Sequence, residues 1–243
     1  MCSVVTWIDP TPSRAELARW SDDGGAGPRG AGARSPRPRT WSTTDHEEAG
    51  IARRIASMAA PRVLEIGSFD GRTTRVLVEA AASKGGVVVV IDPMRWAAET
   101  LSEGLATAAP PSSPPWLHAL DDIMDGVSYE AAFWQNVGPR AASVTLRRNV
   151  STCALLIASE DPCLAAFDVA LLGGEHGYEA VSSDLVHWAA RVVPGGTFYV
   201  RDATLDFPEV LRALSEYAAT HHVTVVAADT ADSLATVHVH ASM

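Results

Sequence analysis

The first chemically informative stretch is a glycine turn between two apolar runs. Residues 63–74 read Val-Leu-Glu-Ile-Gly-Ser-Phe-Asp-Gly-Arg-Thr-Thr, and Gly67 and Gly71 allow the backbone to turn sharply and to approach a ligand. The helix expected after this turn offers unpaired backbone N–H groups to an anionic group. Asp92 follows the next apolar run, 87–91, where a carboxylate can accept hydrogen bonds from two ribose hydroxyls. This spacing predicts a site for a nucleotide-like ligand.

A second polar group follows the apolar run 167–172, which is typical of a buried parallel strand. Glu175 and His176 come shortly after this run, and Asp202 follows the later run 197–200. Ligands of parallel sheets bind at the carboxyl ends of the strands, where a histidine suits proton transfer near neutral pH. The alternative interpretation of His176 is a loop histidine without a catalytic role.

Other histidines and the cysteines carry weaker signals. They are His221, His222, His238 and His240 near the C-terminus, and Cys2, Cys153 and Cys163. The histidines resemble a metal cluster, but their place on a terminal hairpin predicts partial exposure. The cysteines have no C-x-x-C motif and no zinc-site spacing, so we expect free thiols.

Alternating strand and helix patterns must position these residues. Strands are expected over 62–66, 87–91, 142–146, 167–172, 197–200, 223–227 and 234–240, and helices over 44–59, 73–82, 96–107, 129–136, 151–158, 178–192 and 208–219. Strand, glycine turn, helix and strand make a βαβ unit, whereas the last two strands are joined by a short turn and must pair antiparallel. The prediction is an α/β fold with a doubly wound, mostly parallel seven-stranded sheet that ends in an antiparallel hairpin.

Within the helix expected over 178–192, residues at helical spacing predict core packing. They are Tyr178, Val181, Leu185, Trp188 and Val192.

Composition divides the chain into an N-terminal extension, 1–44, and a domain, 45–243. The extension combines a short helix over 12–20 with a Gly/Pro/Arg-rich loop, and a floppy tail and a lid over a substrate both remain open. The 243 residues include 19 basic and 29 acidic side chains, giving a net charge of -10 that argues against a nucleic-acid partner. No apolar run is long enough for a membrane helix, and the N-terminus lacks the order of a signal peptide. We therefore expect a cytoplasmic protein with a small-molecule partner; homo-oligomerisation stays open.

The glycine turn and Asp92 together resemble class I S-adenosylmethionine-dependent methyltransferases. V-L-E-I-G-S-x-D-G at 63–71 is similar to their first motif, and I-D-P-M at 91–94 is similar to the segment with their ribose-binding acid. The resemblance implies S-adenosylmethionine as cofactor and a Rossmann-like methyltransferase fold. It implies cofactor contacts from Glu65 at the methionine amino group, from Gly67, Ser68, Gly71 and Thr73 along the turn, from Asp92 at the ribose, and from Asn149 and Ser151 beside the adenine.

The segment after 167–172 is similar to a subgroup of small-molecule O-methyltransferases whose fourth strand ends in I-D-G-x-H-x-Y. That subgroup includes sugar and natural-product enzymes of antibiotic biosynthesis, some of them metal-dependent. The resemblance implies methyl transfer to a hydroxyl of a secondary metabolite or sugar, with His176 as general base and with Asp202 or Glu175 orienting it. Trp96, Trp116 and Tyr129 border loops that would meet the substrate, but the acceptor cannot be identified.

The sequence departs from this pattern at two positions. Gly173 stands where the family has a metal-binding aspartate, and Arg201 precedes Asp202 where metal-dependent relatives carry an acid. A divalent cation such as Mg²⁺ prefers several carboxylate oxygens, so a metal is doubtful, with Asp202 as its one clear ligand and Glu175 as a substitute. The alternative function is a methyltransferase fold with altered or lost transfer, such as a cyclase-like enzyme or a cofactor-binding protein; a non-catalytic interaction protein is a third interpretation.

Overall fold

The structure is a computed structural model, and it describes residues 43–94, 129–226 and 233–240. The expected helices over 12–20 and 96–107, the extension up to residue 42, and Trp96 and Trp116 lie outside the described residues. Across the described part, no helix is both long enough and apolar enough to cross a membrane.

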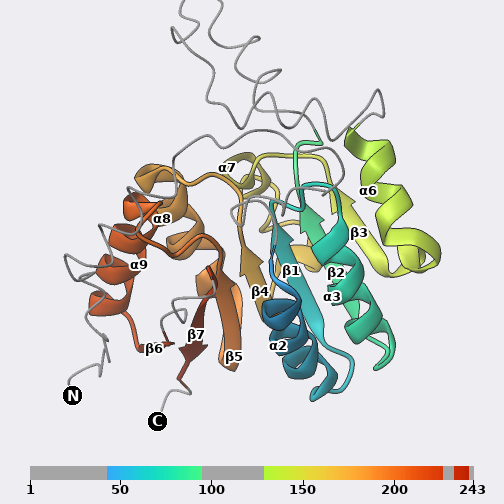
Figure 1. The fold of residues 1–243 in the computed structure, drawn as a ribbon, viewed down its shortest axis with the longest axis horizontal. Helices are drawn as coiled ribbons and strands as arrows, with labels where there is room; N and C mark the ends of the chain where they lie inside the picture. Colours follow the sequence, from blue (N-terminus) through green and yellow to red (C-terminus); the bar gives the residue numbers. More distant parts are fainter. Residues whose placement is uncertain (1–42, 95–128, 227–232, 241–243) are drawn as a thin grey trace, which may run out of the picture.

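Seven strands form one sheet, with the spatial order β3-β2-β1-β4-β5-β7-β6 (Figure 1). In chain order they are β1 (Arg62–Ile66), β2 (Val87–Ile91), β3 (Val144–Arg147), β4 (Phe167–Leu172), β5 (Val192–Val200), β6 (Val223–Val226) and β7 (Ala235–Val239). The first five are parallel, whereas β7 pairs antiparallel with both β5 and β6. The predicted fold class, a doubly wound α/β sheet ending in an antiparallel hairpin, is therefore confirmed.

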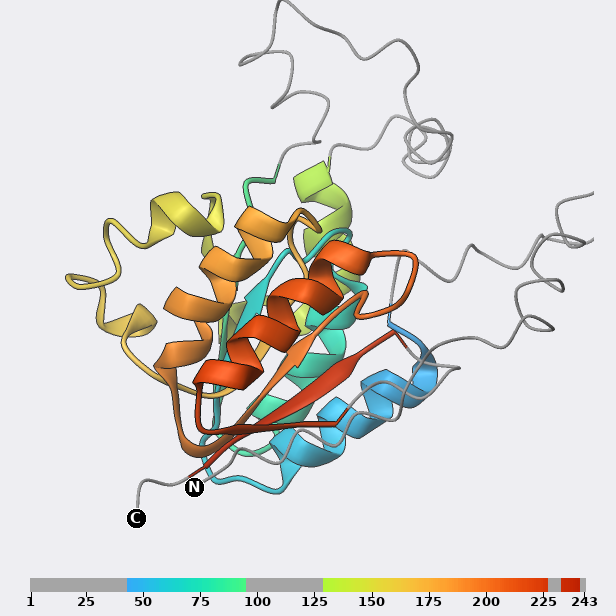
Figure 2. The ribbon, with the colours of Figure 1, turned by 90° about the vertical axis from the view of Figure 1, so that its left-hand side faces the viewer.

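Helices cover both faces of this sheet. The α-helices are α2 (Asp45–Ala56), α3 (Arg72–Ala82), α6 (Tyr129–Val137), α7 (Ser151–Ala154), α8 (Tyr178–His187) and α9 (Pro208–Thr220), and the 3-10 helices are η1 (Gly138–Ser143), η2 (Pro162–Leu164) and η3 (Ala189–Arg191). Side chains of β1 alternate between two cores: Leu64 packs with α7, α8 and α9, and Val63 packs with α2, α3 and α6. Figure 2 shows α8 and α9 side by side on one face, with α2 away from them.

The start of α2 is tied to distant parts of the chain. Thr44 and Glu47 form a capping box, in which each side chain bonds the backbone N–H of the other residue. The Glu47 carboxylate also accepts from the backbone N–H of Ser233 at 2.6 Å, just before β7. Thr43 adds a hydroxyl–hydroxyl bond of 2.8 Å to Thr73 at the start of α3. These bonds fix α2 against the sheet and against the helix that follows the glycine turn.

Two predicted elements near β3 have different boundaries in the structure. The strand expected over 142–146 is β3, Val144–Arg147, because a 3-10 turn that begins at Gly138, with φ +66°, occupies the residues up to Ser143. The helix expected over 151–158 ends as an α-helix at Ala154 and continues as turns. Beyond that point Leu156 and Ile157 are exposed, at 81% and 41%, whereas Ala158 is buried in the same core as Ala154.

The helix expected over 178–192 was also too long. It ends at His187, η3 follows, and Val192 begins β5. The Val192 side chain nevertheless packs in the same core as Leu185 and Trp188, as predicted. Residues 194–196, before the strand expected over 197–200, lie within β5, where Gly195 takes φ +84° and the pairing with β4 is irregular. A strand can absorb such residues as a bulge, which the apolar pattern does not reveal.

Candidate active site

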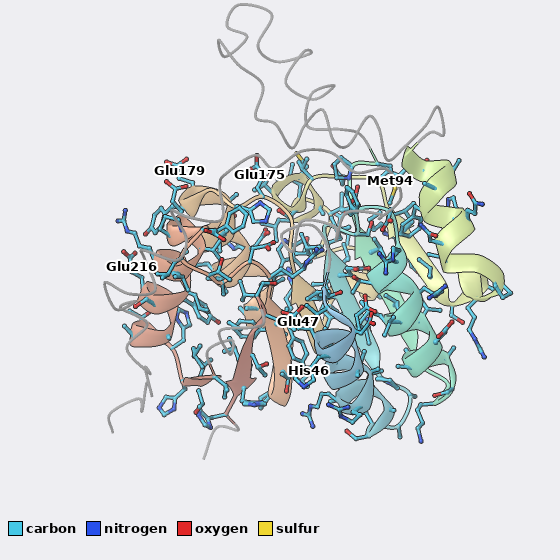
Figure 3. The ribbon with its side chains drawn as sticks, viewed as in Figure 1. His46, Glu47, Met94, Glu175, Glu179 and Glu216 are labelled. Atoms are coloured by element: carbon cyan, nitrogen blue, oxygen red, sulfur yellow. The ribbon has the colours of Figure 1, made fainter. Side chains whose placement is uncertain are left out.

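Most of the predicted site residues that the structure describes lie at one edge of the sheet, because the carboxyl ends of parallel strands lie on the same side. Strand order reverses between β1 and β4, and a crevice outside the strand ends is expected at such a point. Figure 3 labels Met94, just beyond β2, and Glu175, just beyond β4, at this edge. We call the ends of β1 and β2 the β1–β2 half of the site, and the ends of β4 and β5 the β4–β5 half.

Glu65 is the most buried charged group of the β1–β2 half, with no exposed surface. The Thr74 hydroxyl donates to Oε2 at 2.5 Å, whereas Oε1 is buried and has no hydrogen-bond partner in the structure. Burial raises the pKa of the Glu65 carboxyl to about 8. The hydrogen bond from Thr74 and the charge of Arg201 lower this pKa, but by less than burial raises it. A buried oxygen that lacks a partner is suited to receive a cationic amino group.

Asp92 closes the glycine turn from the end of β2. Its Oδ2 accepts from the backbone N–H of Ser68 at 2.8 Å and from the Ser68 hydroxyl at 3.1 Å, and its Oδ1 accepts from the Met94 N–H at 2.8 Å. Asp92 and Ser68 are both buried. The carboxylate therefore holds the turn at the position where a ribose is expected.

The two glycines of the turn lack side chains for steric reasons. Gly67 has φ +76°, and a Cβ there would lie 2.5 Å from the Gly173 carbonyl oxygen. Gly71 has φ +78°, and a Cβ there would lie 2.8 Å from the Phe133 ring. The turn is thus packed between the end of β4 and α6, in a conformation that L side chains rarely adopt.

The other expected cofactor residues have structural partners. Thr73 is buried and bonds Thr43. The Ser151 hydroxyl bonds the Asp184 carboxylate, and the Ser151 carbonyl accepts from the Trp188 indole. Asn149 is half-buried just after β3. Ser151 and Asn149 remain at the predicted edge, while the Thr73 hydroxyl faces α2.

His176 and Asp202 form a pair in the β4–β5 half. Nε2 of His176 lies 2.8 Å from Oδ2 of Asp202, whose side chain is 6% exposed, while the His176 side chain is 38% exposed. Phe207 stacks on the imidazole with ring centroids 4.5 Å apart. Asp202 takes φ +56°, an uncommon backbone conformation that a non-glycine residue keeps where its surroundings hold it. Glu175 is exposed, so Asp202 and not Glu175 is the residue that holds the ring.

Gly173 and Arg201 are in direct contact. A Cβ at Gly173 would lie 2.4 Å from Cδ and 3.1 Å from Cγ of Arg201, so the arginine stem fills the space that a side chain at Gly173 would need. Arg201 is 8% exposed, and its backbone N–H donates to the Leu172 carbonyl at 2.9 Å. The two departures from the family pattern are therefore one structural change.

Sequence reasoning missed three residues of this region. Phe207 stacks on His176, and Thr74 donates a hydrogen bond to Glu65. The sequence pattern did not indicate either contact. Asp184 is buried in α8, its Oδ1 lacks a hydrogen-bond partner, and burial raises its pKa to about 6. A signal existed for Asp184, because an acid between the apolar helical positions 181 and 185 predicts a buried carboxylate.

The described residues do not fit a divalent cation. They contain no group of three His, Cys, Asp or Glu side chains placed to hold a metal. Gly173 has no side chain, the Arg201 stem occupies its space, and Oδ2 of Asp202 already contacts His176. A cation site needs several converging oxygens, which this edge does not supply.

The C-terminal histidines have their own partners and lie away from the strand ends that form the site. His221 stacks on Tyr217, with 3.9 Å between centroids, and His240 bonds the Thr224 hydroxyl at 2.8 Å. His238 lies 3.3 Å from the Thr197 hydroxyl, and burial lowers its pKa. Cys153 and Cys163 are free thiols, as expected.

Comparison with known proteins agrees with this geometry. A model of the methyltransferase domain family matches residues 64–203, from β1 to just beyond Asp202. An O-methyltransferase from Bacillus cereus, solved with S-adenosylhomocysteine, is 15% identical with a TM-score of 0.54, and the match covers 83% of this chain and 84% of that one. TomG from Streptomyces achromogenes, an O-methyltransferase involved in tomaymycin synthesis and solved with S-adenosylmethionine, is 16% identical with a TM-score of 0.53, covering 82% of each chain. No curated protein matches the sequence.

The family model covers more than half of the chain, so the protein belongs to the methyltransferase domain family. The class of enzyme expected from the sequence is thereby confirmed, and the structural likenesses confirm its fold.

Proposed function

We propose that this protein transfers the methyl group of S-adenosylmethionine to a hydroxyl of a small molecule, a secondary metabolite or a sugar. The observation that carries the proposal is the His176–Asp202 pair beyond β4 and β5, next to the glycine turn of a methyltransferase fold. Contact between the backbones of Gly67 and Gly173 places the two halves of the site directly against each other. A methyl donor in one half and an acceptor in the other would be neighbours.

The β1–β2 half fits the proposed cofactor. Oε1 of Glu65 would accept a hydrogen bond from the amino group of the methionine portion, because it is buried without a partner. Asp92 would hold the ribose at the end of β2, and Gly67 keeps the turn free of side-chain atoms. When bound, S-adenosylmethionine supplies an electrophilic methyl group on a sulfonium centre.

The β4–β5 half supports a base. Nε2 of His176 faces the Asp202 carboxylate, so an Nε2–H donates to it and Nδ1 is left to accept a proton. The acceptor hydroxyl gives its proton to Nδ1 as its oxygen bonds the methyl carbon; the carbon–sulfur bond breaks, its electron pair stays on sulfur, and S-adenosylhomocysteine leaves. Alignment and proximity supply much of the acceleration, and a positioned base supplies about 10²- to 10⁴-fold more.

A small acceptor agrees with the charge and the likenesses. The net charge of -10 disfavours nucleic acid, and TomG is involved in the synthesis of a natural product. The His176–Asp202 pair favours a working transferase over the alternative, a fold that binds cofactor without transfer.

Calorimetry with S-adenosylmethionine and S-adenosylhomocysteine tests the cofactor. We expect wild type and the control Glu79→Gln, an exposed residue of α3, to bind alike, and Asp92→Ala to bind at least tenfold more weakly. Incubation with a panel of hydroxylated small molecules, with S-adenosylhomocysteine formation followed by mass spectrometry, tests transfer. A wild type that binds neither ligand contradicts the proposal; binding without product across the panel supports the alternative function.

A further inference from the structure

Three contacts to His176 and to the chain beside it come from one short segment after β5. This segment, residues 202–209, runs from Asp202 to the first turn of α9. The Asp202 carboxylate faces Nε2 of the imidazole at 2.8 Å, and Phe207 stacks on the ring at an interplanar angle of 28°. Glu209 supplies the third contact, to the backbone just after the histidine.

Glu209 bonds the N-terminus of α8, two residues after His176. The helix begins at Tyr178 with Gly177 as its N-cap, and a glycine has no side chain that could accept from the first N–H groups of the helix. Oε2 of Glu209 accepts from the Tyr178 N–H at 3.1 Å instead. The carboxylate therefore fixes the point at which the chain enters α8, and with it the backbone of the preceding histidine.

The Tyr178 side chain adds two contacts between the same helices. Its hydroxyl donates to the Glu216 carboxylate at 2.5 Å, and the Arg212 guanidinium lies over its ring, 4.2 Å from the centroid. The two helices α8 and α9 lie side by side (Figure 2). The start of α8 is thus fixed by residues of α9, the helix that directly follows the segment 202–209.

The segment 202–209 is itself held in place. The Ala203 N–H donates to the Ser233 carbonyl at 2.8 Å, directly after Asp202 with its φ of +56°. Phe207 packs against the core that α8 and α9 share. An imidazole with a phenyl ring against one face and a carboxylate at one nitrogen has little freedom to rotate. Its stable orientation places Nε2 toward Asp202 and leaves Nδ1 away from it.

We infer that Phe207 and Glu209 are positioning residues for the base: Phe207 sets the plane of the imidazole, and Glu209 sets the backbone from which it projects. The inference rests on the proposed function, in which Nδ1 of His176 takes the proton of the acceptor hydroxyl. Neither residue has to touch the substrate or the cofactor in this role. A base acts only within hydrogen-bond reach of the proton that it removes, and a displacement of about 1 Å can lower a rate by about 10²-fold.

The exchange of the imidazole N–H proton with water tests this inference without an acceptor. Protein labelled with ¹⁵N-histidine, with and without S-adenosylhomocysteine, should show a protected ring N–H signal that disappears in His176→Ala. Phe207→Leu and Glu209→Ala should each speed its exchange by about tenfold or more, because the ring leaves Asp202 more often. Phe207→Tyr keeps an aromatic ring and Glu209→Gln keeps an accepting oxygen, so both should stay near the wild-type rate.

Two neighbouring side chains provide matched controls. Leu205 belongs to the same segment and is 46% exposed, and Glu179 is an exposed acid in the first turn of α8, labelled in Figure 3. Leu205→Ala and Glu179→Ala should exchange as wild type does. With any acceptor that gives product, Phe207→Leu and Glu209→Ala should lower kcat by about tenfold or more and leave KM and the binding of S-adenosylhomocysteine unchanged, a split that a merely structural role would not produce.

The outcomes separate the two proposals. Failure of wild type to bind S-adenosylhomocysteine contradicts the proposed function, whereas the exchange rates are measured without that ligand as well. Equal exchange in wild type and Glu209→Ala overturns the positioning role of this exposed acid, and equal exchange in Phe207→Leu overturns that of the ring. A similar acceleration in Leu205→Ala or Glu179→Ala, or a wild type without a protected ring N–H, overturns both.

Discussion

The two halves of the site each bury one acid with an oxygen that lacks a partner, yet they differ in what surrounds it. Glu65 in the β1–β2 half is fully buried and is bonded by Thr74. Asp184 in the β4–β5 half lines a hollow together with His176 and Arg201. The first acid is enclosed by the glycine turn and its helix; the second shares its space with charged groups of both signs.

The two halves also differ in how they are built. The β1–β2 half is formed by the backbone of the glycine turn, and the Asp92 carboxylate holds this turn by accepting from the Ser68 N–H. The β4–β5 half is formed by side chains after two strands, and there the lack of a side chain at Gly173 leaves room for the Arg201 stem. Each variant below changes one half and leaves the other as its internal control.

The largest effect is expected in the β4–β5 half from His176→Ala. Loss of the base should lower kcat by about 10²- to 10⁴-fold, because the acceptor hydroxyl is a poor nucleophile while protonated. Binding of S-adenosylhomocysteine should stay unchanged, since the β1–β2 half is intact. Initial rates of S-adenosylhomocysteine formation, together with calorimetry, measure the two halves separately.

The matched control is His187→Ala, at an exposed histidine in the last turn of α8. It should keep the wild-type rate and affinity. Equal kcat in His176→Ala and wild type would remove the base assignment, whereas a joint loss of rate and binding would mean that the two halves are not separable.

In the β1–β2 half, Glu65→Gln should change how stability depends on pH. The folded pKa of about 8 is higher than the ordinary value, so the folded state holds a proton that the unfolded state releases. This contribution is present at pH 4 and is lost as pH rises toward 8. Within that window wild type should lose up to about 1.4 kcal/mol per pH unit relative to Glu65→Gln.

Chemical denaturation from pH 5 to 9 measures this difference, with Glu79→Gln as a control that should follow wild type. Parallel pH profiles for wild type and Glu65→Gln would show that the buried acid does not hold a proton. Calorimetry in buffers of different ionisation enthalpy adds a second readout. Cofactor binding at pH 7 should release a proton from wild type, because an ammonium group favours the ionised acid, and Glu65→Gln should release none.

The sequence predicted the glycine turn after β1 and the acid at the end of β2, because glycine spacing and an acid at a strand end are local features. Gly67, Gly71 and Asp92 lie where that pattern requires them. The mostly parallel seven-stranded sheet with an antiparallel hairpin at its end was predicted as well, since βαβ units and a short terminal turn leave few arrangements.

Contacts between distant residues could not be predicted in the same way. The stacking of Phe207 on His176 and the contact of Gly173 with Arg201 depend on side chains that follow different strands. Helix ends were also missed, since the apolar pattern continues through Val192 although the chain has changed from α8 to β5. Periodicity reports which residues are buried, and not which element buries them.

A smaller pH effect is expected from Asp184→Asn in the β4–β5 half. Burial raises the pKa of Asp184 from 3.8 to about 6, a smaller shift than that of Glu65. The stability of wild type should therefore again fall with rising pH, but the fall should end at a lower pH than for Glu65. Wild type should lose stability relative to Asp184→Asn as pH rises from about 4 to about 6, with little further change above that. Chemical denaturation at each pH unit from 4 to 9 measures this difference. A difference between wild type and Asp184→Asn that grows between pH 7 and 9 would contradict a pKa of about 6 for Asp184.

The smallest effect is expected from Gly173→Ala. The new Cβ would lie 2.4 Å from Cδ of Arg201, and moving a buried arginine stem should cost about 1 kcal/mol, the lower end for overpacking. Gly50→Ala in α2, where the nearest atom is 4.0 Å away, should not destabilise. Urea denaturation compares both with wild type.

A double-mutant cycle connects that cost to the arginine. If the methyl group and the Arg201 stem compete for one space, Gly173→Ala should cost clearly less when Arg201 is also changed to alanine, with a coupling of about 0.5 kcal/mol or more. Additive costs would mean that glycine at 173 is needed for another reason.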